Sequence, residues 1–229
     1  MGRVLGVDGC RAGWVGIEPG PPVRAYVGAS IGELIDAAAT DGPVAVVGVD
    51  MPIGLPDRGV RQADRLAAAD LGVRRSSVFG TPVRGALEAA THPEAVLVNR
   101  AATGSGVSIQ AYGLRHKILE VDAWLRSGTY GGTVLEVHPE LSFAALAGRT
   151  LATRKPTWAG SYERRRLLAD AGFDLDHDFG PAGRAAGTDD LLDAAAAAWS
   201  AARYLRGEAV SRPDPPERFA DGVPCAIWT

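Results

Sequence analysis

Short apolar runs alternate with turn-forming residues over the first part of the chain. Three such runs, at residues 3–8, 14–18 and 23–27, are separated by GCRAG and PGPP, which is the pattern of consecutive strands joined by tight turns. The stretch SIGELIDAAA at 30–39 then predicts a helix, because Ser30 can cap its start and an acid follows three residues later. The chain is therefore expected to begin with three antiparallel strands and one helix.

The later apolar runs predict two more strands and several helices. Residues 43–52 are almost continuously apolar, which is typical of a strand buried on both faces. Residues 132–140 form a second such run, cut off by a proline. Helices are expected over 58–72, 108–128, 161–171 and 188–207, with irregular connectors over 73–85 and 211–222. The pattern predicts an α/β protein.

Composition limits the class of protein. With 229 residues, of which 46% are hydrophobic, the chain can build one substantial core, so we expect a single domain over 1–229. A net charge of −3 predicts no overall basic surface, and any contact with nucleic acid would need a local patch. Two cysteines and the lack of a long apolar segment favour a cytoplasmic protein with no membrane partner. An oligomer is compatible with this sequence.

Acidic residues stand at the ends of three predicted strands, at Asp8, Asp50 and Glu136. One acid at such a place has an ordinary explanation, because strands end in loops and loops are polar. Three acids in equivalent places are harder to explain in that way. Glu136 also interrupts an apolar strand, where it shares a face with Val134 and His138. We take the three acids as candidate catalytic and metal-binding residues.

The final predicted helix carries further acids near its start. Asp189 and Asp190 lie in the first turn, where carboxylates complement the helix dipole. Asp193 lies one turn farther along, within a run of alanines that should pack closely against a sheet. Burying a lone carboxylate there would be costly. We therefore expect Asp193 to face a catalytic site, with Asp190 as the next candidate metal ligand from this helix.

Electrostatics indicates what such a group of acids would need. Two carboxylates about 4 Å apart repel by roughly 4 kcal/mol at an effective dielectric constant near 20, so three or four cannot all ionise without a counterion. A divalent cation removes the conflict. Oxygen ligands suit Mg²⁺ or Mn²⁺, and two such ions can hold both the attacking and the leaving oxygen of a phosphodiester. The sequence thus predicts a site for Mg²⁺ or Mn²⁺.

The predicted element order resembles the ribonuclease H-like fold of the retroviral integrase superfamily. The motifs GVDGCRAGW, VDMPIGLP, RRSSVFGTPVR, KILEVD, EVHPE and TDDLLDAAAAAW resemble, in order, those of the domain of unknown function 429 family of predicted nucleases. The resemblance implies a mixed five-stranded sheet flanked by helices, with a helical and loop insertion over about 55–107. It also implies a divalent-metal-dependent nuclease that acts on nucleic acid or another phosphodiester. Its metal ligands would be Asp8, Asp50, Glu136 and an acid of the final helix.

Other polar residues are candidates for substrate binding. A loop rich in arginine and serine could hold phosphate oxygens through Arg74, Arg75, Ser76, Ser77 and Arg84. Serines also cap helices and arginines also solvate loops, so both interpretations are open. Lys117 is a further candidate, with an ordinary solvated lysine as the alternative. His138 could relay a proton or be structural, and Cys10 has no histidine nearby in sequence to activate it.

Two other functions remain as alternatives. The stretch GVDGCRAGW also resembles the first phosphate-binding turn of actin-like and sugar-kinase ATPases. An ATP-binding phosphotransferase of that kind usually needs two domains, and no second glycine-rich hairpin is apparent in this chain. The third possibility is a non-catalytic binding protein on the same fold. Such a protein would be expected to have lost one or more of the strand-end acids.

Overall fold

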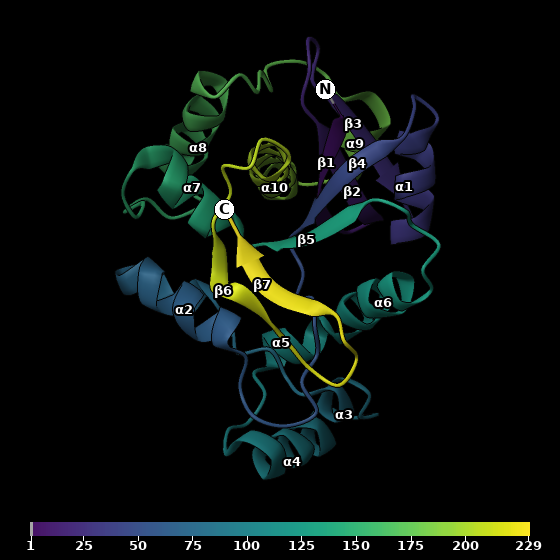
Figure 1. Ribbon diagram of the computed structural model, residues 1–229. Helices are drawn as coiled ribbons and strands as arrows, with labels where there is room; N and C mark the ends of the chain where they lie inside the picture. Colours follow the sequence, from purple (N-terminus) through teal and green to yellow (C-terminus); the bar gives the residue numbers. More distant parts are fainter. Residues whose placement is uncertain (1) are drawn as a thin grey trace. The chain divides into compact units, whose positions relative to one another are not determined.

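The computed structural model describes residues 2–229 and divides into two compact units (Figure 1). The first unit takes in the chain up to Asp50, Tyr130–Val210 and Trp228–Thr229. The second unit takes in Met51–Thr129 and Ser211–Ile227. Residues 55–107, which the sequence suggested as an insertion, lie within the second unit. All candidate strand-end acids and the acidic helix lie within the first unit.

The strands are arranged in the order β3-β2-β1-β4-β5-β7-β6. Strand β1 pairs antiparallel with β2 and parallel with β4, β2 pairs antiparallel with β3, and β4 pairs parallel with β5. Their bounds are β1 Arg3–Cys10, β2 Gly13–Glu18, β3 Arg24–Gly28, β4 Val44–Val49, β5 Thr133–Val137, β6 Ser211–Arg218 and β7 Pro224–Trp228. The α/β class and the antiparallel start are confirmed.

The prediction of five strands was wrong, because the sheet has seven. Strand β6 occupies most of the stretch that was expected to be an irregular connector, and β7 follows it. The sequence SRPDPPER of β6 contains prolines that suppress any strand signal. Such a segment is tolerated here because β6 is the last strand in the order, where one row of backbone N–H groups needs no partner.

The helices of the first unit are α1 Ile31–Ala39, α7 Pro139–Ala147, α8 Trp158–Asp170, α9 Gly180–Ala185 and α10 Thr188–Leu205. Those of the second unit are α2 Gln62–Leu71, the 3₁₀ helix η1 Gly72–Ser77, α3 Arg84–Leu87, α4 His92–Thr103, α5 Ile109–Gly113 and α6 Arg115–Arg126. The single helix expected over 108–128 is two helices, α5 and α6. The expected connector at 73–85 contains most of η1 and the start of α3.

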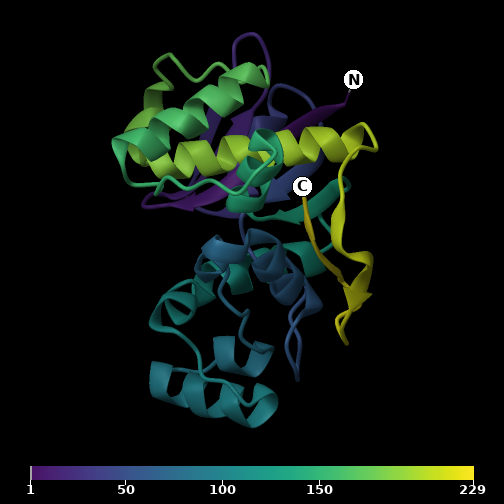
Figure 2. The ribbon, with the colours of Figure 1, turned by 90° about the vertical axis from the view of Figure 1, so that its left-hand side faces the viewer.

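Helix α10 crosses one face of the sheet at close range (Figures 1 and 2). Glycines on two strands permit the approach. A Cβ atom on Gly6 of β1 would lie 2.0 Å from the carbonyl oxygen of Ala194, and one on Gly48 of β4 would lie 2.7 Å from that of Ala197. The alanine run is therefore matched to glycines on the strands, and together they bring the helix backbone almost onto the sheet.

The opposite face of the sheet is covered by α1, which packs on β2 and β3. A Cβ atom on Gly16 would meet the Leu34 side chain at 3.3 Å. Ser30 caps α1 by accepting a hydrogen bond from the backbone N–H of Glu33, as the sequence predicted. The two faces of the sheet are thus distinct: residues aligned with Gly6 and Gly48 face α10, and their neighbours face away from it.

Candidate metal centre

Two strands carry aspartates to the face that α10 covers. Asp8 lies two residues after Gly6 on β1, so both project toward α10. Asp50 lies two residues after Gly48, just past the end of β4, and its backbone N–H donates to the carbonyl of Val7 at 2.8 Å. This bond extends the parallel pairing of β1 and β4 by one residue. The register therefore places the two carboxylates side by side.

Asp193 completes the cluster from α10. Each of the three aspartates Asp8, Asp50 and Asp193 offers one oxygen that could ligate a metal ion, and these oxygens all lie within 4.8 Å of one another. Asp8 is 9% exposed, Asp193 is 3% exposed and Asp50 is half-buried. The tertiary structure thus brings together three of the predicted metal ligands, from positions widely separated in sequence.

Lys155 supplies a positive charge that contacts this cluster directly. Its ammonium group donates to Oδ2 of Asp193 and forms an ion pair with it. The Lys155 side chain is 29% exposed, so it bridges the buried carboxylates and the solvent. The other oxygen, Oδ1 of Asp193, is buried and has no hydrogen-bond partner among the described residues. A buried carboxylate oxygen in that state is suited to a cation.

The pKa values of two acids respond to this crowding. Burial is the main cause that raises the pKa of Asp8 well above its ordinary value, and the charge of Asp50 raises it further. Lys155 and a hydrogen bond from the Gly9 N–H act in the opposite direction. Burial also raises the pKa of Asp50, against the lowering effects of His138 and Lys155. Burial therefore disfavours the ionised forms of both acids, and the charge of Asp50 adds to this effect at Asp8.

Acids near the cluster have structural partners of their own. Asp190 accepts a hydrogen bond from the Gly187 N–H at 2.9 Å, which closes the start of α10, and its charge also raises the pKa of Asp8. Glu140 of α7 forms an ion pair with the buried Arg164 at 2.6 Å. These two acids shape the electrostatic field around the site. The cluster that could hold a metal ion contains Asp193 and does not contain Asp190.

Glu136 lies elsewhere. Its neighbours on β5, Leu135 and Val137, face α10: Leu135 packs with Ala201, and Val137 approaches Gly48. Since alternate residues of a strand project oppositely, Glu136 points from the other face of the sheet. It is 5% exposed and is not one of the three clustered acids. Of the predicted acids, the structure brings Asp8, Asp50 and Asp193 together and leaves Glu136 apart.

The predicted substrate-binding residues all belong to the second unit. Arg84 forms two hydrogen bonds with Asp122, at 2.7 and 2.8 Å, and a longer ion pair with Asp221. The Ser77 hydroxyl donates to the carbonyl of Arg74 and closes a turn of η1. Arg75 and Ser76 are exposed on η1, and Lys117 is half-buried on α6. Arg84 and Ser77 thus have structural roles within this unit.

Lys155 is the residue that the sequence analysis missed. A signal for it existed in the composition, because only two of the 24 basic residues are lysines. Arginine fills the other basic positions, so a lysine marks a place where a compact ammonium group could be preferred over a planar guanidinium group. The second lysine, Lys117, is one of the predicted substrate-binding residues. Spacing alone could not connect Lys155 with Asp193, which lies 38 residues away.

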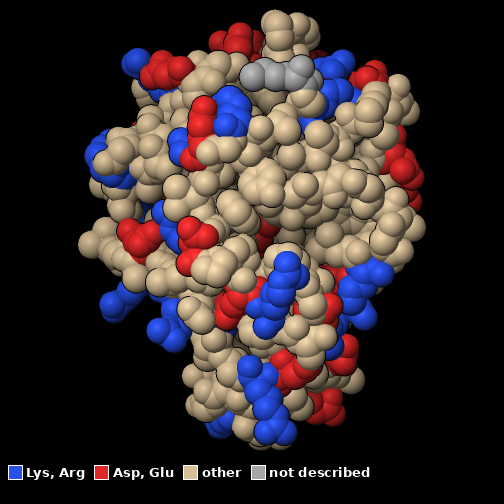
Figure 3. Space-filling view, viewed as in Figure 1, with Lys and Arg blue, Asp and Glu red and all other residues tan. Residues whose placement is uncertain are grey.

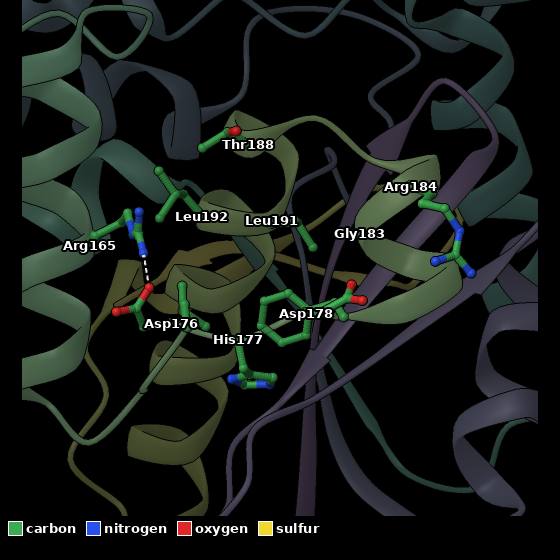
Figure 4. Close-up of a pocket in the computed structure, with 11 residues that line it drawn as sticks. Arg165, Asp176, His177, Asp178, Gly183, Arg184, Thr188, Leu191 and Leu192 are labelled. Carbon is green, nitrogen blue, oxygen red and sulfur yellow. Dashed lines mark hydrogen bonds and ion pairs between the residues drawn. The ribbon is translucent and has the colours of Figure 1, made fainter.

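A separate hollow lies between α9, α8 and the start of α10 (Figure 4). It encloses about 410 Å³. Arg165 lies on one side and forms an ion pair with Asp176 at 2.9 Å, and Leu191 and Leu192 line it from α10. The carbonyl oxygen of Val23 accepts a hydrogen bond from Nε2 of His177 at 3.0 Å, so the ring is held next to the start of β3. The lining is mixed, and one of its two arginines, Arg165, is already paired with an acid.

The surface shows no uniform field on the face seen in Figure 3, where acidic and basic side chains are interspersed. This pattern agrees with the small net charge of −3. Any recognition of a charged ligand must therefore depend on local groups of residues.

None of the helices formed by residues 2–229 combines the length and the apolar character needed to cross a membrane.

Fold and site together define an α/β protein with a buried group of three aspartates that could hold a divalent metal ion. The family model described as "Protein of unknown function (DUF429)" matches residues 6–218, and the chain belongs to this family. Searches of curated proteins and of solved structures found no match. The family membership that the motifs indicated is confirmed, and the activity has to be argued from the site.

Proposed function

We propose that the three-aspartate cluster binds Mg²⁺ or Mn²⁺ and that the protein hydrolyses phosphodiester bonds, as a nuclease. The observation that carries the proposal is the convergence of Asp8, Asp50 and Asp193, with their oxygens within 4.8 Å. At that separation each pair of ionised carboxylates repels by about 3 kcal/mol at an effective dielectric constant near 20. Buried acids whose pKa values are raised by burial and by a neighbouring charge are characteristic of functional sites.

The residues fit a divalent ion in both charge and donor chemistry. Three ionised carboxylates and the Lys155 ammonium sum to a charge of −2, which one divalent cation cancels. The donors are all carboxylate oxygens, which Mg²⁺ and Mn²⁺ prefer. Oδ1 of Asp193 is buried, has no hydrogen-bond partner within residues 2–229 and is the natural ligand atom on α10. When bound, the ion would supply Lewis-acid activation of water and stabilisation of charge on the phosphate.

The protein's own residues would orient the substrate. Asp8 and Asp50 are held by neighbouring parallel strands, so the spacing of their oxygens is set by the sheet register. Lys155 is partly exposed beside the carboxylates and could donate from Nζ to a phosphate oxygen. Because Asp193 holds the ammonium in place, the lysine would need little reorganisation on binding.

The ribonuclease H-like assignment is part of the same proposal. Three leading strands, a helix, a fourth strand followed directly by Asp50, a fifth strand and the acidic helix α10 occur in the order on which that resemblance rests. The hairpin at GVDGCRAGW, which suggested an ATPase, has a packing explanation. A Cβ atom on Gly13 would lie 2.4 Å from the Gly28 carbonyl oxygen of β3, so its glycine is required by the sheet.

The test is a cleavage assay on single-stranded, double-stranded and branched oligonucleotides with Mg²⁺, Mn²⁺ or chelator, with ATP hydrolysis measured in parallel. Wild type should cleave only with metal, and D8N, D50N and D193N should each lose at least about 100-fold in rate. The matched control is D36N, which changes an exposed aspartate on α1 across the sheet. Calorimetric titration with Mn²⁺ should show binding to wild type and D36N and none to D8N.

Three results would reject parts of the proposal. Equal behaviour of wild type and the three site variants on every substrate would reject catalysis at the cluster. Metal binding that survives in D8N and D193N would reject the cluster as the metal site. ATP hydrolysis without phosphodiester cleavage would favour the phosphotransferase alternative.

A further inference from the structure

Helix α8 presents two large aromatic side chains to solvent. Trp158, its first residue, is 83% exposed, and Tyr162, one turn later, is 53% exposed. Residues four apart lie on the same face of a helix, so the rings form a stripe. Tryptophan is normally buried to a large degree, and exposed aromatic side chains are enriched where proteins bind partners. Arg166 continues the stripe by another turn and is also exposed.

The exposure is a fixed property of this face, because the opposite face of α8 is anchored. Gly160, Arg164 and Leu168 are buried, and α8 packs against α7 and α10 (Figure 2). Arg164 forms an ion pair with Glu140 of α7 and donates to the Gly160 carbonyl at 3.1 Å. The Thr157 hydroxyl accepts from the Gly160 N–H and caps the helix. These contacts prevent the helix from turning its rings inward.

Exposed cations flank the rings. Arg154 lies four residues before Trp158 and is exposed. A hydrogen bond with Tyr162 raises the pKa of Arg166. The acids on α8 are largely occupied or distant from the rings: Glu163 pairs with Arg149 at 2.6 Å, and Asp170 lies at the far end of the helix. Rings flanked by exposed guanidinium groups complement a ligand that has both flat apolar surfaces and negative charge.

The same segment reaches the metal centre. Lys155 contacts Asp193 and precedes Trp158 by only three residues. Three residues of chain span at most about 11 Å, so the Trp158 backbone lies close to the backbone that positions the ammonium. The chain from Arg154 to Arg166 therefore links an exposed surface to the aspartate cluster. We call Arg154, Trp158, Tyr162 and Arg166 the α8 surface.

We propose that the α8 surface binds single-stranded nucleic acid and leads it to the aspartate cluster. Bases stack on Trp158 and Tyr162, and Arg154 and Arg166 contact the phosphates. Aromatic rings combined with basic groups are the ordinary means of holding single strands, since every base has a flat face that stacks. In a duplex the base faces are covered by neighbouring pairs, so the rings select open strands. The assignment of substrate class rests on the proposed nuclease function, whereas binding to the surface can be measured separately.

The experiment is fluorescence anisotropy with a labelled single-stranded 20-mer, a matched duplex and their RNA counterparts, in chelator so that no metal-dependent cleavage occurs. Wild type should bind the single strand more tightly than the duplex. W158A/Y162A should bind it at least about 10-fold more weakly, since loss of one stacked base weakens binding by roughly 5- to 150-fold. W158F, which retains a ring, should lose less than W158A.

Two controls separate stacking from charge and from general surface effects. R154Q/R166Q should reduce the slope of log affinity against log salt by about 1.4, the value for two phosphate contacts on a single strand. L97A removes another exposed apolar side chain, on α4, and should bind as wild type does. Circular dichroism and thermal melting confirm that each variant is folded.

The outcomes distinguish this inference from the proposed nuclease function. Equal affinity of wild type and W158A/Y162A for single strands, or no binding by wild type, would overturn the inference even if cleavage is found. Weaker binding by W158A/Y162A without cleavage by wild type would support the inference and reject the nuclease. A concentration-dependent dimer in sedimentation experiments that W158A/Y162A abolishes would assign the surface to a second copy of the chain and overturn the inference.

Discussion

The ammonium group of Lys155 is paired with the carboxylate of Asp193, although 38 residues separate the two in the chain. One comes from the loop before α8 and the other from α10, and their contact closes the cluster formed with Asp8 and Asp50. The pair has two consequences. It partly neutralises the three clustered aspartates, and it connects the cluster to the segment that carries the exposed rings of α8.

Replacing Lys155 by methionine should destabilise the protein in chelator by about 1–3 kcal/mol, because Asp193 would lose its charged partner while remaining buried. A saturating divalent cation should recover more stability in K155M than in wild type. Urea unfolding in chelator and in Mn²⁺ measures both effects. K117M is the matched control, since it removes the other lysine of the chain. Equal losses in the two variants would contradict the assigned role of Lys155.

Replacing Asp8 by asparagine should stabilise the protein in chelator at neutral pH while abolishing stabilisation by Mn²⁺. Burial and Asp50 raise the pKa of Asp8, so ionised Asp8 opposes folding. As pH rises from about 4 through the raised folded pKa, wild type should lose stability that D8N keeps. Unfolding free energies measured between pH 4 and 8 test this, and parallel pH profiles for the two proteins would refute it.

Glu18 should make the opposite contribution at low pH. Hydrogen bonds from Arg3, Tyr26 and Arg24 hold its pKa at about 2, despite the opposing effect of burial. A lowered folded pKa stabilises the protein above the unfolded value near 4.5, and this stability is lost as pH falls toward 2. We expect a loss on the order of 1–3 kcal/mol, since Arg24 is 47% exposed and partly screened.

Acid unfolding of E18Q against wild type measures this contribution. E18Q should be less stable at pH 7 and should lose less stability between pH 5 and 2. The matched control E33Q changes a glutamate that accepts a backbone hydrogen bond from Ala29 near the start of α1. The same slope in E18Q and wild type would show that the network around Glu18 does not control acid stability.

Substituting alanine for Gly6 should disrupt both the fold and the site. The added Cβ would lie 2.0 Å from backbone atoms of Ala194 and Ala198, so α10 would have to move away from β1. We expect a loss of about 3 kcal/mol or more and weaker Mn²⁺ binding, because Asp193 would move with the helix. Thermal melting and calorimetry measure the two effects.

G113A is the control for this substitution. Gly113 ends α5, and an added Cβ would meet nothing within 4 Å, so alanine should be neutral or slightly stabilising. If G6A melts like wild type, then the close approach of α10 to the sheet does not limit stability.

Much of the fold could be predicted because its signals are local. The capping by Ser30, the apolar run of β4 and the alanine-rich stretch of α10 each report their element directly. The prolines of β6 argue against a strand, and only pairing with a neighbouring strand makes that segment a strand. The break between α5 and α6 was missed because it falls inside a continuous helical pattern.

By itself the sequence determined the family, the α/β class and the three acids of the cluster. The reason is that motif order, periodicity and strand-end position can all be read along the chain. Only the tertiary structure decided that Glu136 projects from the other face of β5 and that Lys155 joins Asp193. The physical reason is that charge interactions act through space. Which carboxylates lie close enough to interact electrostatically depends on strand register and on how closely α10 packs on the sheet.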